Sequence, residues 1–287
     1  MRQFLQNLYE LLEMIKIGHS VLALPFAFMG AMLAARGLPD GRTNFFILVA
    51  MVGARAAAMA FNRLADAPLD ALNPRTRDRA LPAARVSRRA AWMLTISSAL
   101  VFMGAAAQLN RLCLLLSPLA LLVILGYSLT KRFTSLSHLV LGLSLGLAPL
   151  GGWLAVRGGD LSPAVLALSA AVIFWVAGFD ILYSLQDEDF DRRLGLSSLP
   201  ARLGATGARR LSALFHLAAA ACFGLTGLLA GLGAVYAGAV LLTSLILLFQ
   251  HVLLSSRNPL HLPPAFFTLN GLVGLGLALA TWLSLAV

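Results

Sequence analysis

Two stretches of the sequence place oxygen-bearing side chains at regular intervals of four residues. The first reads NRLADAPLDALNPRTRDRALP over residues 62–82, and the second reads YSLQDEDFDRRLGLSSLPARLG over residues 183–204. Residues four apart share one face of a helix, so each stretch predicts a column of such side chains. The members of the two columns are Asn62, Asp66, Asp70, Tyr183, Asp187 and Asp191.

The chemistry of these columns points to a hard divalent cation. Aspartates that converge in an apolar setting are unfavourable unless cations pair with them. A ligand set of oxygens, without His or Cys, suits Mg²⁺, which proteins hold through a few carboxylates together with substrate phosphates. The spacing therefore predicts a site for Mg²⁺ and a diphosphate.

Basic residues accompany the acidic columns. Arginine can bind phosphate oxygens with two parallel hydrogen bonds. Arg55 lies seven residues before Asn62, nearly on the same helical face and inside an apolar segment, where an arginine is a functional-site candidate. The other candidate phosphate donors are Arg75, Arg77, Arg79, Lys131 and Arg132.

Structural explanations compete with these functional ones. The aspartates of the two columns could form salt bridges with neighbouring arginines. Asp180 could serve in proton relay or as a structural hydrogen-bond partner, and the sequence leaves both open. The five histidines have no metal-ligand spacing, and Cys113 and Cys222 lie singly in apolar segments, so no metal or disulfide is assigned to either residue type. Basic loop residues that we interpret first as topology signals are Arg63, Arg85, Arg88, Arg89, Arg209 and Arg210.

The composition is that of an integral membrane protein. Hydrophobic residues make up 59% of the chain and the mean hydropathy is +0.84, more apolar surface than a soluble domain of this size can bury. Runs of about 20 apolar residues predict membrane-spanning helices. Nine are expected in an all-α bundle, over residues 17–36, 44–61, 90–108, 112–129, 137–156, 163–184, 211–231, 233–254 and 265–287.

The distribution of Lys and Arg predicts the orientation. Most of them fall at the N-terminus and in the loops 62–89, 130–136, 185–210 and 255–264, which the positive-inside rule places in the cytoplasm. This asymmetry accounts for the net charge of +10 without a nucleic-acid partner. Residues 1–16 predict an interfacial helix with an apolar stripe of Phe4, Leu8, Tyr9, Leu12 and Ile15.

The two acidic stretches also suggest an internal duplication. They lie four predicted spans apart, so both face the same side, and each is followed by a Leu-Pro-Ala sequence. We expect spans one to four to repeat as spans five to eight, with a ninth helix added. Pro68 interrupts the first column and removes a helical hydrogen bond to Leu64, so a kink or helix end is expected near Asp66 and a less regular first column than second.

These motifs resemble those of the UbiA-type intramembrane aromatic prenyltransferases. Asn62, Asp66 and Asp70 with the following TRDRALP match the first family motif, and Tyr183, Asp187 and Asp191 match the second. Arg55 matches an arginine that the family places seven residues before the Asn. The resemblance runs through KIGHSVLALPFAF, YSLTKRFT and AFFTLNG, and is strongest to the 4-hydroxybenzoate polyprenyltransferase branch.

The resemblance implies a single nine-helix domain over residues 1–287 that transfers a polyprenyl group from its diphosphate to an aromatic acid through an allylic cation. The reaction belongs to ubiquinone or menaquinone synthesis, and the prenyl tail leaves sideways into lipid. It implies metal ligation by Asp66, Asp70, Asp187, Asp191 and Asn62, with Mg²⁺ as the cofactor. Tyr183 joins the four aspartates as a catalytic residue, and the substrate is bound by Arg55, Asn62, Arg75, Arg77, Arg79, Lys131 and Arg132.

Several alternatives stay open. The acceptor could be a naphthoate such as 1,4-dihydroxy-6-naphthoate rather than 4-hydroxybenzoate. Haem O synthase and chlorophyll synthase relatives share the outline, and a membrane transporter shares the repeats. The CDP-alcohol phosphotransferases require an Asp-Gly and Ala-Arg pattern that this sequence lacks. No obligate protein partner is indicated.

Overall fold

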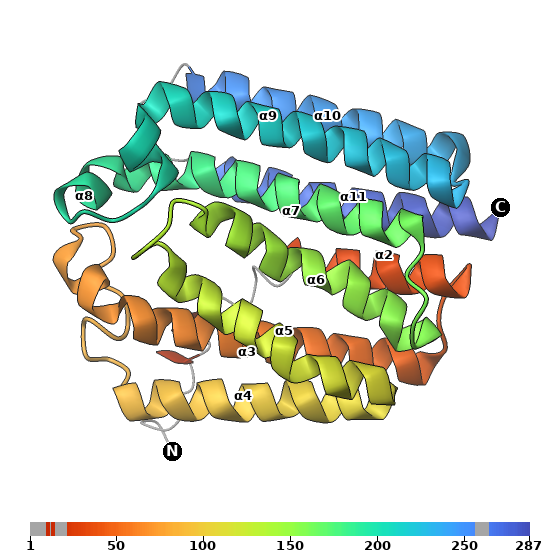
Figure 1. Cartoon of the computed structure of the whole chain (residues 1–287), viewed down its shortest axis with the longest axis horizontal. Coiled ribbons are helices and arrows are strands. Elements are labelled where there is room, and N and C mark those ends of the chain that lie inside the picture. The colour runs from red at the N-terminus through yellow and green to blue at the C-terminus, as the bar shows by residue number, and fades with distance from the viewer. Residues whose placement is uncertain (1–9, 12, 15–21, 256–263) are drawn as a thin grey trace.

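The computed structural model describes residues 10–11, 13–14, 22–255 and 264–287, and every regular element in these ranges is helical (Figure 1). Eight of these helices are long and apolar enough to cross a bilayer, and α2 (Leu24–Ala35) is a shorter apolar helix. After α7, the chain forms a short 3₁₀ turn, η2 (Leu185–Asp187), and a six-residue helix, α8 (Glu188–Arg193). The long helices are α3 (Gly41–Leu72), α4 (Arg88–Leu109), α5 (Arg111–Thr130), α6 (Ser137–Arg157), α7 (Pro163–Ser184), α9 (Leu199–Ala230), α10 (Gly233–Ser255) and α11 (Pro264–Ala286).

The predicted all-α membrane bundle is confirmed. Each predicted span corresponds to one helix, either α2 or one of the eight long helices. Two helices extend well beyond the apolar runs. α3 continues to Leu72, so the first part of the predicted loop 62–89 is helical. α9 begins at Leu199 and has one non-helical residue, Gly204, at φ 70°. Hydropathy detects only the apolar part of a helix, which is why it misses these polar ends.

The expected helix end near Asp66 is wrong. α3 passes through Pro68 and ends at Leu72. Contacts from the following loop stabilise its last turn. The Thr76 hydroxyl donates to the Asp70 carbonyl at 3.2 Å, and Arg79 binds the Asp70 carboxylate. Because proline costs one hydrogen bond near a helix end, these contacts can offset the loss.

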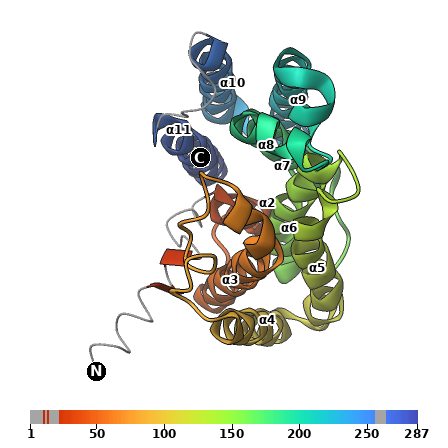
Figure 2. The same ribbon diagram turned by 90° about the vertical axis from the view of Figure 1, so that its left-hand side faces the viewer.

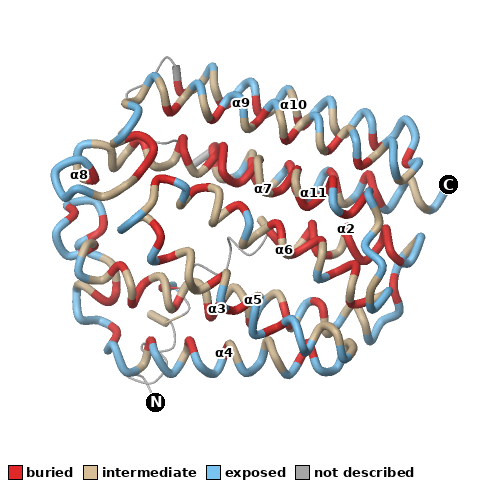
Figure 3. Tube along the Cα trace, in the orientation of Figure 1, coloured by how far each residue is buried: buried red, intermediate tan, exposed pale blue. Residues whose placement is uncertain are grey.

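α7 is the central helix of the bundle. It packs against α6 and α9, and most of its length is buried (Figures 2 and 3). Its Trp175 is fully buried, lies 5.2 Å from the ring of Phe26 on α2, and donates from Nε1 to the Asn270 side chain on α11 at 3.1 Å. This hydrogen bond satisfies the indole N–H in an apolar interior. α7 thus fixes α2 and α11 around the end that carries the second motif.

The outward faces of the helices are apolar. Leu122 on α5, Leu228 on α9 and Leu241 on α10 are 69%, 82% and 63% exposed. Exposed apolar faces of this extent are unfavourable in water and suited to contact with lipid.

Glycine allows α2 and α6 to lie backbone against backbone. A Cβ on Gly152 would collide with the Ala27 carbonyl oxygen, and one on Gly30 would collide with the Pro149 carbonyl oxygen. Small residues at such crossings are typical of helix packing in membranes. This contact positions α6 as one wall of the cavity described below.

The predicted interfacial helix falls largely outside the described residues, including its whole apolar stripe. The described part contributes two contacts to the body of the protein. Met14 is buried in a cluster with Ala60 and Leu64 of α3, and the Glu10 carboxylate lies 3.0 Å from Arg85 Nε.

Gly152→Ala should destabilise the protein by about 1–3 kcal/mol, because the new methyl group meets backbone that cannot rotate away. Thermal unfolding in detergent, followed by intrinsic fluorescence, measures this change. Gly104→Ala on α4 is the matched control, because nothing lies within 4 Å of its added Cβ. Equal melting temperatures for the two variants would contradict the close α2–α6 contact.

Candidate active site

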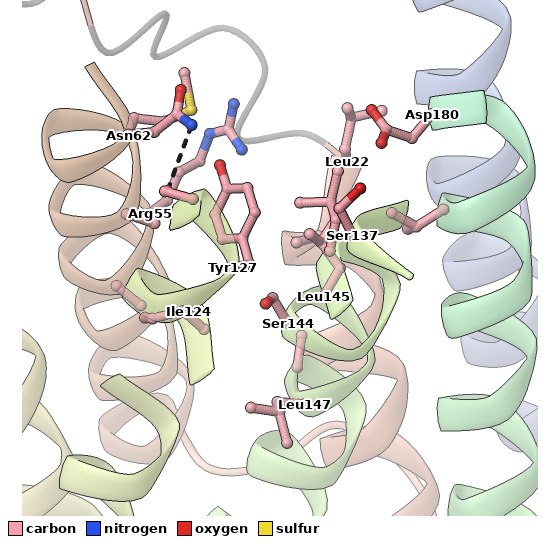
Figure 4. Close-up of a pocket in the computed structure, with 18 of the residues that line it drawn as sticks. Leu22, Arg55, Asn62, Ile124, Tyr127, Ser137, Ser144, Leu145, Leu147 and Asp180 are labelled. Carbon is pink, nitrogen blue, oxygen red and sulfur yellow. Dashed lines mark hydrogen bonds between the residues drawn. The ribbon is translucent and has the colours of Figure 1, made fainter. Parts of the chain in front are cut away.

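One cavity of about 550 Å³ lies inside the bundle and receives side chains from both acidic motifs. Figure 4 shows its walls, with Arg55, Asn62 and Tyr127 on one side and Asp180 on the other. All six motif residues predicted from the sequence line this cavity. The two motifs, more than a hundred residues apart in the chain, therefore contribute to one site at the end of the bundle near α8, which we call the motif end.

The first motif lies on a continuous helix, so its side chains share one face of α3. Asp66 is 6% exposed, and its Oδ2 accepts a hydrogen bond from the Asn62 amide at 3.1 Å. Lys131 Nζ from the loop after α5 lies 3.3 Å from the same oxygen. The other oxygen of Asp66, Oδ1, is buried without a hydrogen-bond partner in the described part of the chain. An unpartnered carboxylate oxygen in this position is suited to a cation.

Asp70 is neutralised by the loop that follows α3. Arg79 Nη1 lies 2.8 Å from Oδ1 and 2.9 Å from Oδ2 of the carboxylate. Because Asp70 is only 6% exposed, this ion pair is shielded from water.

Arg75 from the same loop binds the second motif. Its guanidinium forms two hydrogen bonds with the Asp187 carboxylate, of which the Nε bond to Oδ1 measures 3.0 Å, and it donates to the Tyr183 hydroxyl at 3.1 Å. The Asn73 amide also donates to Asp187 Oδ1, at 3.0 Å. Burial works against the charged form, but the bonds to Asp187 outweigh it and raise the pKa of Arg75. A loop of the first half thus binds the acidic motif of the second half.

The second motif is the less regular of the two, which reverses the expectation. α7 ends at Ser184, the chain passes through η2, and Asp187 has φ −106° and ψ 6°. Asp191 lies on α8 and is 7% exposed. The sequence spacing was correct, but the three residues do not share one α-helix, because the 3₁₀ turn changes the direction of the chain.

Three of the four motif aspartates, Asp66, Asp70 and Asp187, are each paired with a Lys or Arg. Among the described residues, no three His, Cys, Asp or Glu side chains lie close enough together to hold a metal ion. The donor set nevertheless fits a hard cation, because it consists of carboxylate and amide oxygens and includes the unpartnered Asp66 Oδ1. The predicted metal ligation stays a prediction.

Arg55 lies farther from the motif end than the aspartates do. It is two helical turns before Asn62, about 10 Å along the axis of α3, and it lines the cavity near Tyr127 (Figure 4). Its Nε is buried without a hydrogen-bond partner among the described residues. A guanidinium whose buried Nε has no protein acceptor is suited to an anionic group of a ligand.

Two of the predicted substrate-binding residues do not line the cavity. Arg77 is exposed in the loop after α3. The Arg132 guanidinium donates to the backbone carbonyl of Ala65 instead. Both are close in sequence to basic residues that do line the cavity. Charge and sequence position alone therefore could not distinguish the two groups.

Other cavity residues were missed by the sequence analysis. Arg63, interpreted as a topology signal, is 8% exposed and lines the cavity, with its Nε 3.4 Å from the Met14 carbonyl. Its spacing of eight from Arg55 on one helix was the available signal. His138 was given no role, yet its Nδ1 lies 2.7 Å from Asp180 Oδ2 in the cavity wall. Nothing in the sequence links these two residues, which are 42 positions apart.

Comparisons with known proteins agree with this geometry. The UbiA prenyltransferase family profile matches residues 23–272. A 4-hydroxybenzoate octaprenyltransferase from Shewanella pealeana is 31% identical over 255 residues, which are 88% of this chain and 87% of the relative. The apo structure of a UbiA homologue from Aeropyrum pernix K1 is 38% identical, with a TM-score of 0.84 over 92% of this chain and 97% of that one.

A second solved structure shows the same fold at lower identity. It is a UbiA homologue from Archaeoglobus fulgidus bound to GPP and Mg²⁺, 18% identical, with a TM-score of 0.73 over 97% of this chain and all of that one (100%). The profile covers most of the chain, and the relative from Shewanella pealeana matches nearly its whole length. The chain is therefore a multi-pass membrane protein that belongs to the UbiA prenyltransferase family.

Proposed function

We propose that this enzyme transfers a polyprenyl group from its diphosphate to an aromatic hydroxy acid of the 4-hydroxybenzoate type, with Mg²⁺ as the metal. One observation carries the proposal: a single cavity joins an end rich in carboxylates and cations to an apolar interior lined by Arg55, whose Nε is buried without a partner among the described residues. The relative from Shewanella pealeana supports this acceptor, and the homologue from Archaeoglobus fulgidus supports a prenyl diphosphate with Mg²⁺. Membership of a family of prenyltransferases favours prenyl transfer over the alternative of a membrane transporter.

The motif end would bind the diphosphate. Asp66, Asp70, Asp187 and Asp191, with the Asn62 amide, would hold Mg²⁺, which supplies positive charge to the departing diphosphate. Arg75, Arg79 and Lys131 would then exchange their carboxylate partners for phosphate oxygens. Fixed positive charges aimed at a leaving group lower the barrier to its departure, especially where water is excluded.

The apolar part of the cavity would receive the start of the prenyl chain. A chain of several isoprene units exceeds a cavity of about 550 Å³, so the rest of the tail would extend into lipid. Apolar residues in these walls include Ala27, Ile47, Met51, Phe102, Leu116 and Leu147.

We place the motif end in the cytoplasm, since Arg75, Arg79, Lys131 and their basic neighbours gather there. Labelling of a cysteine introduced at Arg77 by a membrane-impermeant reagent, from one side of the membrane at a time, tests this orientation.

The direct test is prenyl transfer by purified protein in detergent. Geranyl diphosphate and Mg²⁺ are supplied with either 4-hydroxybenzoate or 1,4-dihydroxy-6-naphthoate, and the product is identified by mass. A prenylated 4-hydroxybenzoate supports the proposal. If only the naphthoate is prenylated, the acceptor is a naphthoate instead of 4-hydroxybenzoate. Absence of both products and of diphosphate binding would overturn it.

In this assay, Asp66→Asn and Asp187→Asn should each abolish turnover while the protein stays folded, because each removes a metal-binding charge. EDTA should do the same, reversibly on addition of Mg²⁺. Asp189→Asn is the matched control, since Asp189 is exposed and does not line the cavity. Full activity in either of the first two variants would remove that aspartate from the metal site.

Arg75→Gln should change two affinities in opposite directions. Without Arg75, Asp187 loses a cation that competes with the metal, so Mn²⁺ alone should bind several-fold more tightly. Electron paramagnetic resonance measures this affinity. Diphosphate should bind about tenfold more weakly, since a charge-assisted contact is lost. Arg85→Gln, which removes a pair outside the cavity, should change neither affinity. A fall in both affinities would indicate that Arg75 only maintains the structure.

Arg55→Gln should raise the KM for the aromatic acid about 10- to 100-fold, because a hydrogen bond to a charged group is lost. The KM for methyl 4-hydroxybenzoate, which has no carboxylate, should change little. Arg77→Gln is the matched control at an exposed site. Equal effects of Arg55→Gln on the acid and the ester would place the acid carboxylate elsewhere.

A further inference from the structure

Asp180 is one of two cavity carboxylates, with Asp191, that form no ion pair with a Lys or Arg among the described residues. Its side chain is 24% exposed, on α7 and two helical turns before Asp187. Asp66, Asp70 and Asp187 are each paired with a Lys or Arg, whereas in the described part of the chain Asp180 is paired only with His138, at 2.7 Å. It is thus a cavity carboxylate that no fixed cation neutralises.

Two hydrogen bonds fix the protonation of His138. The Leu199 backbone N–H lies 3.5 Å from Nε2 and can only donate, so Nε2 is the acceptor nitrogen. Nδ1 then carries the proton and donates to Asp180 Oδ2. The second oxygen, Oδ1, accepts no hydrogen bond from the described residues and is available to a ligand.

Asp180 faces Arg55 across the cavity (Figure 4). One wall therefore offers a guanidinium whose buried Nε has no protein acceptor, and the opposite wall offers a free carboxylate oxygen. A molecule with an anionic group at one end and a hydroxyl at the other matches both walls at once. A hydroxylated aromatic acid has this arrangement.

We propose that Asp180 Oδ1 binds the ring hydroxyl of the acceptor and takes its proton during transfer, with His138 as the residue that positions Asp180. This inference rests on the proposed function and adds the group that selects a hydroxyl-bearing ring. Removal of the hydroxyl proton increases the electron density of the ring carbon beside it, which is the nucleophile.

The C1–O bond of the prenyl diphosphate breaks, its electron pair leaves with the diphosphate, and the ring carbon then forms a C–C bond to the allylic cation at C1. The hydroxyl proton moves to Asp180, which gives a ring ketone. The ring carbon then loses its proton to water or diphosphate while Asp180 returns its proton to the ring oxygen. One C–C bond has replaced one C–H and one C–O bond, and one proton is released.

The test compares 4-hydroxybenzoate with 4-methoxybenzoate, whose ether oxygen cannot donate. Wild-type protein loaded with Mg²⁺ and a non-reactive geranyl thiodiphosphate should bind the hydroxy acid about 10- to 100-fold more tightly, by calorimetry. In Asp180→Asn this preference should fall below about threefold, and turnover of 4-hydroxybenzoate should drop at saturating acceptor. Binding of the thiodiphosphate should stay unchanged. Asp160→Asn, at an exposed residue outside the cavity, should behave as wild type.

His138 supplies a second arm that does not depend on the folding of Asp180→Asn. His138→Gln retains a donor toward Asp180 and should keep most of the preference, whereas His138→Leu should lose it. If Asp180→Asn keeps the preference for the hydroxy acid, the inference is overturned. If Asp180→Asn does not fold, a preference kept by His138→Leu overturns it instead. In both cases, turnover by the wild-type protein leaves the proposed function intact. A wild-type protein that binds no thiodiphosphate and prenylates neither acceptor overturns the proposed function itself.

Discussion

Repulsion among buried carboxylates is the constraint on which this structure depends. Five aspartates line one cavity, four of them from the two motifs, and burial makes each ionised group costly unless a cation compensates it. Arg75, Arg79 and Lys131 provide that compensation for Asp187, Asp70 and Asp66. The loop after α3 lies across the motif end because it carries two of these cations.

The same ion pairs explain how the cavity can be stable and reactive. Under the proposed function, the basic side chains that neutralise aspartates in the absence of substrate would already lie within reach of a diphosphate and its metal. Binding of that substrate would exchange one set of opposite charges for another, so the site would not have to bury a new net charge. Farther from the motif end, Arg55 and the pair of Asp180 with His138 place single charges on opposite apolar walls. Each therefore acts where water screens it little.

The sequence predicted the bundle and most of the motif site, because apolar runs and four-residue spacing record local helical geometry. Asp66, Asp70, Asp187 and Asp191 were found for this reason. Tertiary contacts were not predictable in this way. The continuation of α3 past Pro68 depends on Arg79 and Thr76 from the loop, and the 3₁₀ turn at Asp187 leaves no mark in the spacing.

The contact between His138 and Asp180 is a second example of a tertiary contact that the sequence could not predict. They come from different helices, and a single sequence does not record which residues meet across a bundle. Arg63 was missed because a basic residue at a helix end fits both lipid-facing topology and a cavity wall. Arg63 is buried, and its Nε donates to the Met14 carbonyl, a contact that no local pattern specifies.

The source of the three cations has a consequence for biosynthesis. Arg75, Arg79 and Lys131 all precede residue 137, so the half of the chain that is made first carries both its own acidic motif and the charges for the second. A ribosome therefore delivers Asp187 to a bundle in which Arg75 already exists. The reverse order would leave the second motif without a partner at the membrane surface until synthesis was nearly complete. The two halves, although similar in pattern, are not interchangeable as assembly units.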